Sequence, residues 1–149
     1  MGETVLVFVD LAQGKQRLGG SALAQVFKQL GADSPDVEDA AELKAFFQAV
    51  QLLKSSSTVL AYHDRSDGGL FTTLVEMAFA GRCGIEVSIP GDDAIAALFN
   101  EELGAVFQIR AKDMVSFTEA FVKFGFPTRH LHAIGKATVD QTVNIIHKS

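Results

Sequence analysis

The stretch "LAYHDRSDGGLF", residues 60–71, changes within a few positions from an apolar run to a polar cluster and then to a glycine pair. Residues 58–62 predict a strand, and residues 70–80 predict a helix that ends at Gly81. The polar cluster between them consists of His63, Asp64, Arg65, Ser66 and Asp67. Because α/β folds place ligands at the carboxyl ends of strands, we interpret this unit as a candidate binding site.

The residue types in the cluster suit a phosphate and a metal ion. Asp64 supplies a hard oxygen ligand of the kind that Mg²⁺ prefers. Ser66 can donate a hydrogen bond to a phosphate oxygen, and Arg65 can pair with one. Gly68 and Gly69 allow close backbone approach to a ligand, and the helix that they open presents free N–H groups and a positive dipole end. The pattern indicates part of a nucleotide-phosphate and Mg²⁺ site.

A purely structural interpretation of the same residues also stands. Asp67 before two glycines is typical of a helix N-cap followed by an ordinary turn. A second Gly-Gly-Ser, residues 19–21, opens another helix and is compatible with the same cleft, although a structural cap is the favoured interpretation. The chain contains neither of the two common nucleotide fingerprints, G-x-x-x-x-G-K-[ST] and G-x-G-x-x-G.

The rest of the chain alternates between strand and helix patterns. Strands are expected at residues 4–9, 84–89 and 104–111, and helices at residues 22–30, 43–54, 92–99 and 114–124. Ser21 is the expected N-cap of the first helix, whose apolar face holds Leu23, Val26, Phe27 and Leu30. Residues 130–137 and 142–147, joined around Asp140-Gln141, predict a terminal hairpin. We therefore predict an α+β fold, a mixed sheet with packed helices.

Other polar residues are weaker candidates for a site. His130, His132 and His147 lack metal-ligand spacing, and we expect the first two on one face of a strand, exposed or satisfied by a hydrogen bond. The acidic stretch "NEEL", residues 100–103, predicts a solvated turn.

Composition bounds the class of protein. The 149 residues are 48% apolar, which fits a single globular domain over residues 1–149. A net charge of −5 argues against nucleic-acid binding, and the sequence has neither an apolar run long enough to cross a membrane nor a signal peptide. The lone Cys83 excludes an internal disulfide and fits a reducing cytosol. We expect a cytoplasmic domain, excised from a larger protein because it has no tail at either end.

Four motifs in order carry a family resemblance: "DLAQGKQRLGGSALAQVF", "AYHDRSDGGL", "EMAFAGRCGI" and "LFNEELGAVFQI". From residue 4 to residue 146 the chain closely resembles phosphoribosylformylglycinamidine synthase, the ATP-dependent amidotransferase and ligase of purine biosynthesis. The resemblance implies an AIR-synthase-type C-terminal domain, the second of two copies, which packs against an N-terminal half-domain and precedes a glutaminase domain. The implied reaction converts formylglycinamide ribonucleotide, ATP and glutamine to the amidine, ADP, phosphate and glutamate.

The resemblance also implies site residues. The family's Mg²⁺-binding aspartate falls on Asp64 and its nucleotide-contacting serine on Ser66, while the turn formed by Asp67, Gly68 and Gly69 supports nearby phosphate groups. The implied cofactors are Mg²⁺ and ATP or ADP. No catalytic residue of this chain is implied, and no role is assigned to His63 or Arg65. The family has a catalytic and a structural nucleotide site, and the sequence is compatible with either.

Two further expectations follow. Because the rest of the enzyme lies outside the chain, we expect the domain alone to be inactive, to expose an apolar sheet face or edge, and to self-associate at high concentration. The alternative is a non-catalytic nucleotide-binding or dimerisation module of the same fold. Selenophosphate synthetase and thiamine-monophosphate kinase are more distant options, since "LFNEELGAV" suggests neither.

Overall fold

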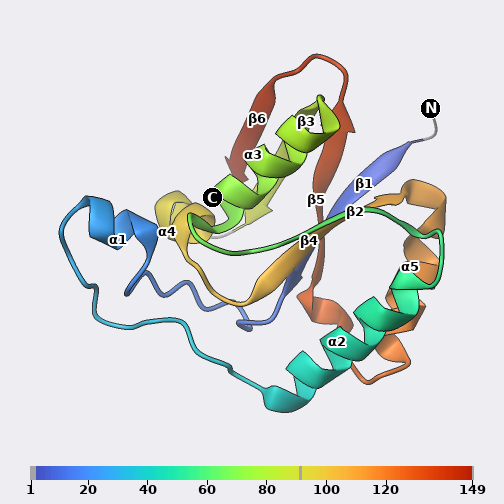
Figure 1. Cartoon of the computed structure of the whole chain (residues 1–149), viewed down its shortest axis with the longest axis horizontal. Helices are drawn as coiled ribbons and strands as arrows, with labels where there is room; N and C mark the ends of the chain where they lie inside the picture. Colours follow the sequence, from blue (N-terminus) through green and yellow to red (C-terminus); the bar gives the residue numbers. More distant parts are fainter. Residues whose placement is uncertain (1–2, 91, 149) are drawn as a thin grey trace.

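A computed structural model describes residues 3–90 and 92–148, which form one six-stranded sheet with helices on both faces (Figure 1). The strands are β1 Thr4–Asp10, β2 Val59–Asp64, β3 Gly84–Pro90, β4 Gly104–Arg110, β5 Leu131–Thr138 and β6 Val143–Lys148. The helices are α1 Ala22–Val26, α2 Ala40–Lys54, α3 Gly69–Gly81, α4 Ala94–Phe99 and α5 Met114–Val122, with short 3-10 turns η1 Ala111–Asp113 and η2 Thr128–His130. The predicted α+β class with a mixed sheet is confirmed.

The strand order is β2-β4-β1-β5-β3-β6, and the neighbours are antiparallel except for the parallel pair β3 and β6. The predicted terminal hairpin is therefore wrong, because β3 lies between β5 and β6. The connection crosses the start of β3 at Gly84, where a Cβ atom would lie 2.5 Å from Asp140 Oδ1 and from the Thr142 carbonyl oxygen. The missing side chain lets the connection pass, and β3 becomes an interior strand.

Two apolar cores lie on opposite faces of the sheet because strand side chains alternate. Helices α2 and α5 cover the face that holds Val7, Val9 and Phe107. Helices α3 and α4 cover the other face, which holds Leu6, Val87 and Ile89. The loops that follow β1 and β2 lie beside the first turn of α3, since Gly14, Arg65 and Leu70 line the same cavity.

Helix α1 is shorter than predicted, and its apolar face is exposed. It ends at Val26, and Lys28 adopts a left-handed backbone with φ of 56°. The exposed fractions of Val26, Phe27 and Leu30 are 77%, 67% and 86%, so three of the four residues predicted for its apolar face lie in solvent. The reason is the position of α1, which lies at the left edge of the view, outside the sheet (Figure 1), and buries only Ala24.

Strand β2 continues to Asp64, two residues beyond the predicted end, so His63 and Asp64 belong to the sheet and not to the following loop. They pair with Val106 and Ala105 of β4. Successive strand residues face opposite sides, so the two side chains leave the sheet in different directions. In the part of the chain that the structure describes, no helix has the length and apolar character needed to cross a membrane.

Candidate functional site

Arg65 anchors the loop that joins β2 to α3. Its backbone N–H donates to the Gly104 carbonyl at 2.7 Å, and its Nε and Nη2 donate to the carbonyls of Glu102 and Leu103 at 2.5 and 3.0 Å. The side chain is only 3% exposed and lies 5.0 Å over the ring of Phe8. Burial lowers the pKa of Arg65 to about 10, although the nearby Asp10 and Glu102 carboxylates oppose this effect. Arg65 therefore fixes the loop from the inside.

The two glycines of the motif are required by the fold itself. Gly68 and Gly69 have φ values of +85° and +69°, a region that favours glycine. A Cβ atom on Gly69 would lie 2.6 Å from the carbonyl oxygens of Leu98 and Asn100, at the end of α4. The Gly69 N–H donates to the Ser66 carbonyl at 2.9 Å. The glycine pair thus lets α3 start in direct contact with the end of α4.

The N-cap of α3 is Gly68 and not Asp67, which corrects the structural interpretation of the motif. Instead of a capping side chain, the carboxylate of Glu101 accepts the Gly68 N–H at 2.8 Å. Asp64, Ser66 and Asp67 are exposed, and within residues 3–90 and 92–148 none of their side chains has a hydrogen-bond partner. The five predicted site residues therefore divide into three outward polar groups and two inward glycines.

Asp64 offers one oxygen ligand and no cage for a metal. Among the described residues, no group of three or more His, Cys, Asp or Glu side chains lies close enough to hold a metal ion. Mg²⁺ commonly takes one or two carboxylates and completes its shell with waters and substrate phosphates. The single outward carboxylate fits such an ion. The Asp64 carbonyl is already engaged, because Thr73 Oγ1 donates to it at 3.3 Å and His63 Nδ1 lies 2.6 Å away.

Two ring side chains, Tyr62 and His63, precede Asp64 in β2, and the negative charge of Asp64 raises the pKa of each. Burial raises the pKa of Tyr62, and the negative charge of Asp64 adds to this rise. His63 Nε2 lies 2.7 Å from Glu76 Oε2 on α3. Burial by itself lowers the pKa of His63, but the hydrogen bonds to the Asp64 carbonyl and to Glu76, together with both negative charges, raise it on balance.

Residues 100–103 form a buried hub, so the prediction of a solvated turn is wrong. Asn100 and Glu102 are fully buried. Arg17 binds the Glu102 carboxylate through Nε at 2.6 Å and Nη2 at 2.8 Å, and the Asn100 amide donates to the Ala96 carbonyl at 2.6 Å. Since Arg17 lies 85 positions away in sequence, no local pattern signals this partner.

The hub also connects the two glycine turns. Glu101 Oε1 accepts the Gly68 N–H and the Ala22 N–H, each at 2.8 Å. The Gly-Gly-Ser turn acts as a cap, as favoured from the sequence, because the Ser21 hydroxyl accepts the Ala24 N–H at 3.2 Å. The two turns that resemble each other in sequence are thus neighbours in space, and Glu101 is the functional candidate that sequence reasoning missed.

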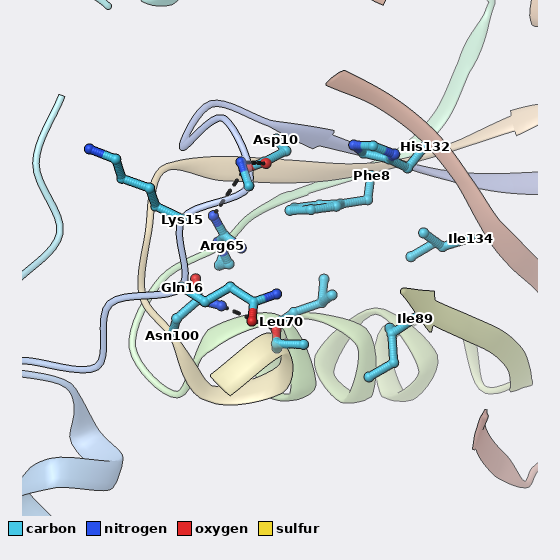
Figure 2. Close-up of a pocket in the computed structure, with 12 residues that line it drawn as sticks. Phe8, Asp10, Lys15, Gln16, Arg65, Leu70, Ile89, Asn100, His132 and Ile134 are labelled. Carbon is cyan, nitrogen blue, oxygen red and sulfur yellow. Dashed lines mark hydrogen bonds and ion pairs between the residues drawn. The ribbon is translucent and has the colours of Figure 1, made fainter. Parts of the chain in front are cut away.

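A cavity of about 230 Å³ lies between the sheet and helices α3 and α4 (Figure 2). Figure 2 shows Phe8 and His132 on one side of it and Leu70 and Ile89 on the other. Of the polar cluster at residues 63–67, only Arg65 lines this cavity. Asp10, Lys15, Gln16 and Asn100 add polar groups to its walls, whereas Asp64, Ser66 and Asp67 are not among the lining residues.

The histidines differ from expectation. His130 lies in η2 and not in a strand, and its buried ring forms the expected satisfied contact, with Nδ1 3.1 Å from Glu42 Oε2. His132 stacks on Phe8 with ring centroids 6.1 Å apart. Burial lowers the pKa of His132, which favours the neutral ring.

Comparison with known proteins identifies similar domains. The family described as "AIR synthase related protein, C-terminal domain" matches residues 2–148. Among solved structures, Thermotoga maritima PurL complexed with ATP superimposes with a TM-score of 0.70 at 13% identity, over 99% of this chain and 24% of that chain. The same enzyme complexed with FGAR gives 0.70 at 15% identity, over 99% and 26%.

A hydrogenase maturation protein has the same fold. Escherichia coli HypE superimposes with a TM-score of 0.64 at 19% identity, over 97% of this chain and 46% of that chain. The chain therefore spans about a quarter to a half of the length of these structures. At such identities the likeness concerns the fold alone.

Proposed function

Because this chain belongs to the AIR synthase-related C-terminal domain family, we propose that it is such a domain of a phosphoribosylformylglycinamidine synthase. In this role it contributes one wall of a Mg²⁺-nucleotide site to an ATP-dependent ligase that acts on formylglycinamide ribonucleotide with glutamine as amide donor. The proposal rests on the four motifs of the sequence and on the form of the loop after β2.

One observation carries the site. Asp64, Ser66 and Asp67 face solvent without partners in the described chain, while the loop that bears them is held by Arg65 and by the glycine contacts. A segment that is fixed on its inner side and unsatisfied on its outer side is arranged to present polar groups to a ligand. An ordinary surface turn needs neither a buried guanidinium nor a glycine at a position where any side chain would clash with a neighbouring backbone.

The proposed roles follow from the chemistry of each group. Asp64 binds Mg²⁺ through its outward carboxylate, and Ser66 donates its hydroxyl to the nucleotide. Asp67 lies beside the phosphates on the turn that Gly68 and Gly69 shape. Mg²⁺ bound there would neutralise phosphate charge and orient the nucleotide. Since one carboxylate is a small part of a metal shell, the other ligands would come from the nucleotide and from the remaining domains of the enzyme.

The proposed partners are those remaining domains, namely an N-terminal half-domain and a glutaminase domain. The exposed side chains of Val26, Phe27 and Leu30 agree with a surface that another part of the enzyme covers. The alternative, a non-catalytic nucleotide-binding or dimerisation module, predicts instead that these side chains join two copies of the chain. Sedimentation of the wild type and of Phe27→Ser over a range of concentrations tests this surface. A dimer that persists at low concentration and is lost in Phe27→Ser favours the module, whereas association at high concentration alone fits a domain that lacks its covering partner.

Calorimetric titration of Mg·ADP into the chain tests the site. We expect weak binding, since one wall of a cleft makes few contacts, and we expect Asp64→Ala to abolish it. Asp33→Ala is the matched control, because Asp33 is also exposed but lies outside the loop. Equal affinity of the wild type and Asp64→Ala would contradict the metal role. Normal turnover of a full-length synthase that carries Asp64→Ala would favour the non-catalytic module.

A further inference from the structure

One carboxylate oxygen joins two segments that lie far apart in the sequence. Glu101 Oε1 accepts the N–H of Gly68, the N-cap of α3, and the N–H of Ala22, the first residue of α1, each at 2.8 Å. Hydrogen bonds to an ionised carboxylate are about twice as strong as neutral ones. A negative charge at the start of a helix also meets the positive end of its dipole. Both effects favour this shared contact.

Glu101 is itself held firmly. Its neighbours Asn100 and Glu102 are fully buried, and each is fixed by its own side-chain bonds, to Ala96 and to Arg17. The backbone that carries Glu101 is thus held on both sides by buried, hydrogen-bonded residues. If the start of either helix is displaced, the carboxylate must lose one of its two bonds or shift away from the other.

The occupied N–H groups also define what the glycine turn can offer a ligand. The Gly68 N–H is taken by Glu101, and the Gly69 N–H is taken by the Ser66 carbonyl at 2.9 Å. Neither is free to bind a phosphate. The contribution of the turn is then its shape, which sets where Ser66 and Asp67 stand.

We propose that Glu101 is the positioning residue of this loop: it holds the turn at residues 67–68 in the form that presents Ser66 and Asp67, and it makes that form depend on the start of α1. The presentation of a nucleotide rests on the function proposed above, whereas the coupling between the two turns does not. Helix α1 is five residues long and buries only Ala24, so the bond from Ala22 to Glu101 is a main link between this helix and the loop.

A single substitution removes one of the two donors without disturbing either helix. Proline is favoured at the first position of a helix and has no N–H, so Ala22→Pro deletes the donor to Glu101. Ser21, which precedes it, already has φ of −63° and ψ of 160°, a conformation that suits a residue before proline. Ala22→Ser is the matched control, because it keeps the N–H.

The first readout is the amide resonance of Gly68 in the free chain. We expect Ala22→Pro to displace this resonance and Ala22→Ser to leave it near its wild-type position. In a Glu101→Ala background the additional Ala22→Pro change has no effect, which separates coupling through the carboxylate from mere proximity of the proline ring. An unmoved Gly68 resonance in Ala22→Pro overturns the coupling, and so does a displacement that persists in Glu101→Ala.

The second readout is hydrogen exchange. Loss of a hydrogen bond to a charged group lowers the protection of an amide by about tenfold or more. We expect this loss at both Gly68 and Ala22 in Glu101→Ala, with partial rescue in Glu101→Gln, which keeps an acceptor oxygen. Unchanged protection at both amides in Glu101→Ala overturns the proposal, and the wild-type spectrum of residues outside the two turns verifies folding.

The third readout is Mg·ADP affinity. If the wild type binds, we expect Glu101→Ala to weaken binding by about tenfold, Glu101→Gln to recover part of the loss, and Ala22→Pro to weaken binding more than Ala22→Ser does. Equal affinities overturn the positioning role. If the wild type fails to bind Mg·ADP, nucleotide binding by the isolated domain is disproved, and so is the nucleotide part of this inference. The Gly68 resonance still decides whether Glu101 couples the two turns.

Discussion

Two acidic segments of this chain have similar residue types and opposite environments. Residues 63–67 carry their carboxylates outward and without partners, whereas residues 100–103 carry theirs inward, with Glu102 fully buried. From sequence the first was interpreted as a site and the second as a solvated turn. The structure shows that the second segment supports the first, because Glu101 and the Glu102 carbonyl bind the Gly68 N–H and the Arg65 side chain.

The difference between the segments is the presence of distant partners. A buried carboxylate costs several kcal/mol of desolvation unless a cation and hydrogen bonds compensate it. Arg17 supplies this compensation to Glu102, and it also binds Glu38 at 2.7 Å. The hydrogen bond to Glu102, followed by the charges of both carboxylates, raises the pKa of the Arg17 guanidinium although burial opposes the rise. Asp64 and Asp67 have no such partner in the described chain, so they stay in water and remain available to a ligand.

The largest predicted effect comes from the inward segment. Glu102→Ala removes a fully buried carboxylate and leaves the Arg17 guanidinium without its main partner. We expect the free energy of unfolding to fall by about 3 kcal/mol, measured by urea denaturation. Glu119→Ala, which removes an exposed glutamate of α5, is the control. Equal losses in the two variants would contradict the structural role assigned to residues 100–103.

The contact between the segments gives the next effect. Gly69→Ala forces a positive φ on alanine and drives its Cβ against the Leu98 and Asn100 carbonyls. We expect a loss of about 2 kcal/mol in the free energy of unfolding. Gly14→Ala measures the cost of the positive φ without a clash, since Gly14 has φ of +83° and nothing within 4 Å of the added carbon. A Gly69→Ala loss no greater than the Gly14→Ala loss would show that α3 and α4 do not limit this position.

The elements that could be predicted from sequence are those with local causes. The strand patterns at residues 4–9 and 84–89 predicted β1 and β3, and the glycines at positions 69 and 81 mark the two ends of α3. The hairpin was wrong because strand pairing depends on which distant strand is available, and β3 takes the place beside β5. The exposure of the apolar face of α1 could not be predicted either, since an apolar stripe predicts a buried face without saying what covers it.

The candidate site divides in the same way. The motif at residues 63–69 could be found because its polar residues and glycines are adjacent, and its ligand roles stay predictions. The role of Glu101 could not be found, because its two donors come from positions 22 and 68 and its neighbours appear in sequence as a polar turn. Only the folded chain brings these three positions together.

A smaller effect is expected at His63, the first residue of the segment 63–67. Although burial lowers it, the pKa of His63 is raised on balance by its hydrogen bonds to the Asp64 carbonyl and to Glu76 and by both negative charges. These contacts therefore stabilise the fold fully below the unfolded-state pKa of about 6.5, and their contribution is lost as pH rises through the raised folded-state pKa. We expect His63→Gln to cost about 0.5 kcal/mol at pH 5.5 and almost nothing at pH 9, because partly exposed pairs are weak. The difference in urea midpoint between wild type and variant measures it, and Glu76→Gln should reproduce the part that comes from Glu76.

The smallest effect on stability concerns Asp64, Ser66 and Asp67 themselves. It distinguishes side chains that stabilise the fold from side chains that are free to bind a ligand. Because Asp64, Ser66 and Asp67 make no side-chain hydrogen bonds in residues 3–90 and 92–148, their removal takes nothing from the folded state. We expect the triple alanine variant to unfold within about 0.5 kcal/mol of the wild type while losing Mg·ADP binding. Retained stability with lost binding fits residues kept for a ligand. A large loss of stability would mean that these side chains serve the fold, and the contrast with residues 100–103 would disappear.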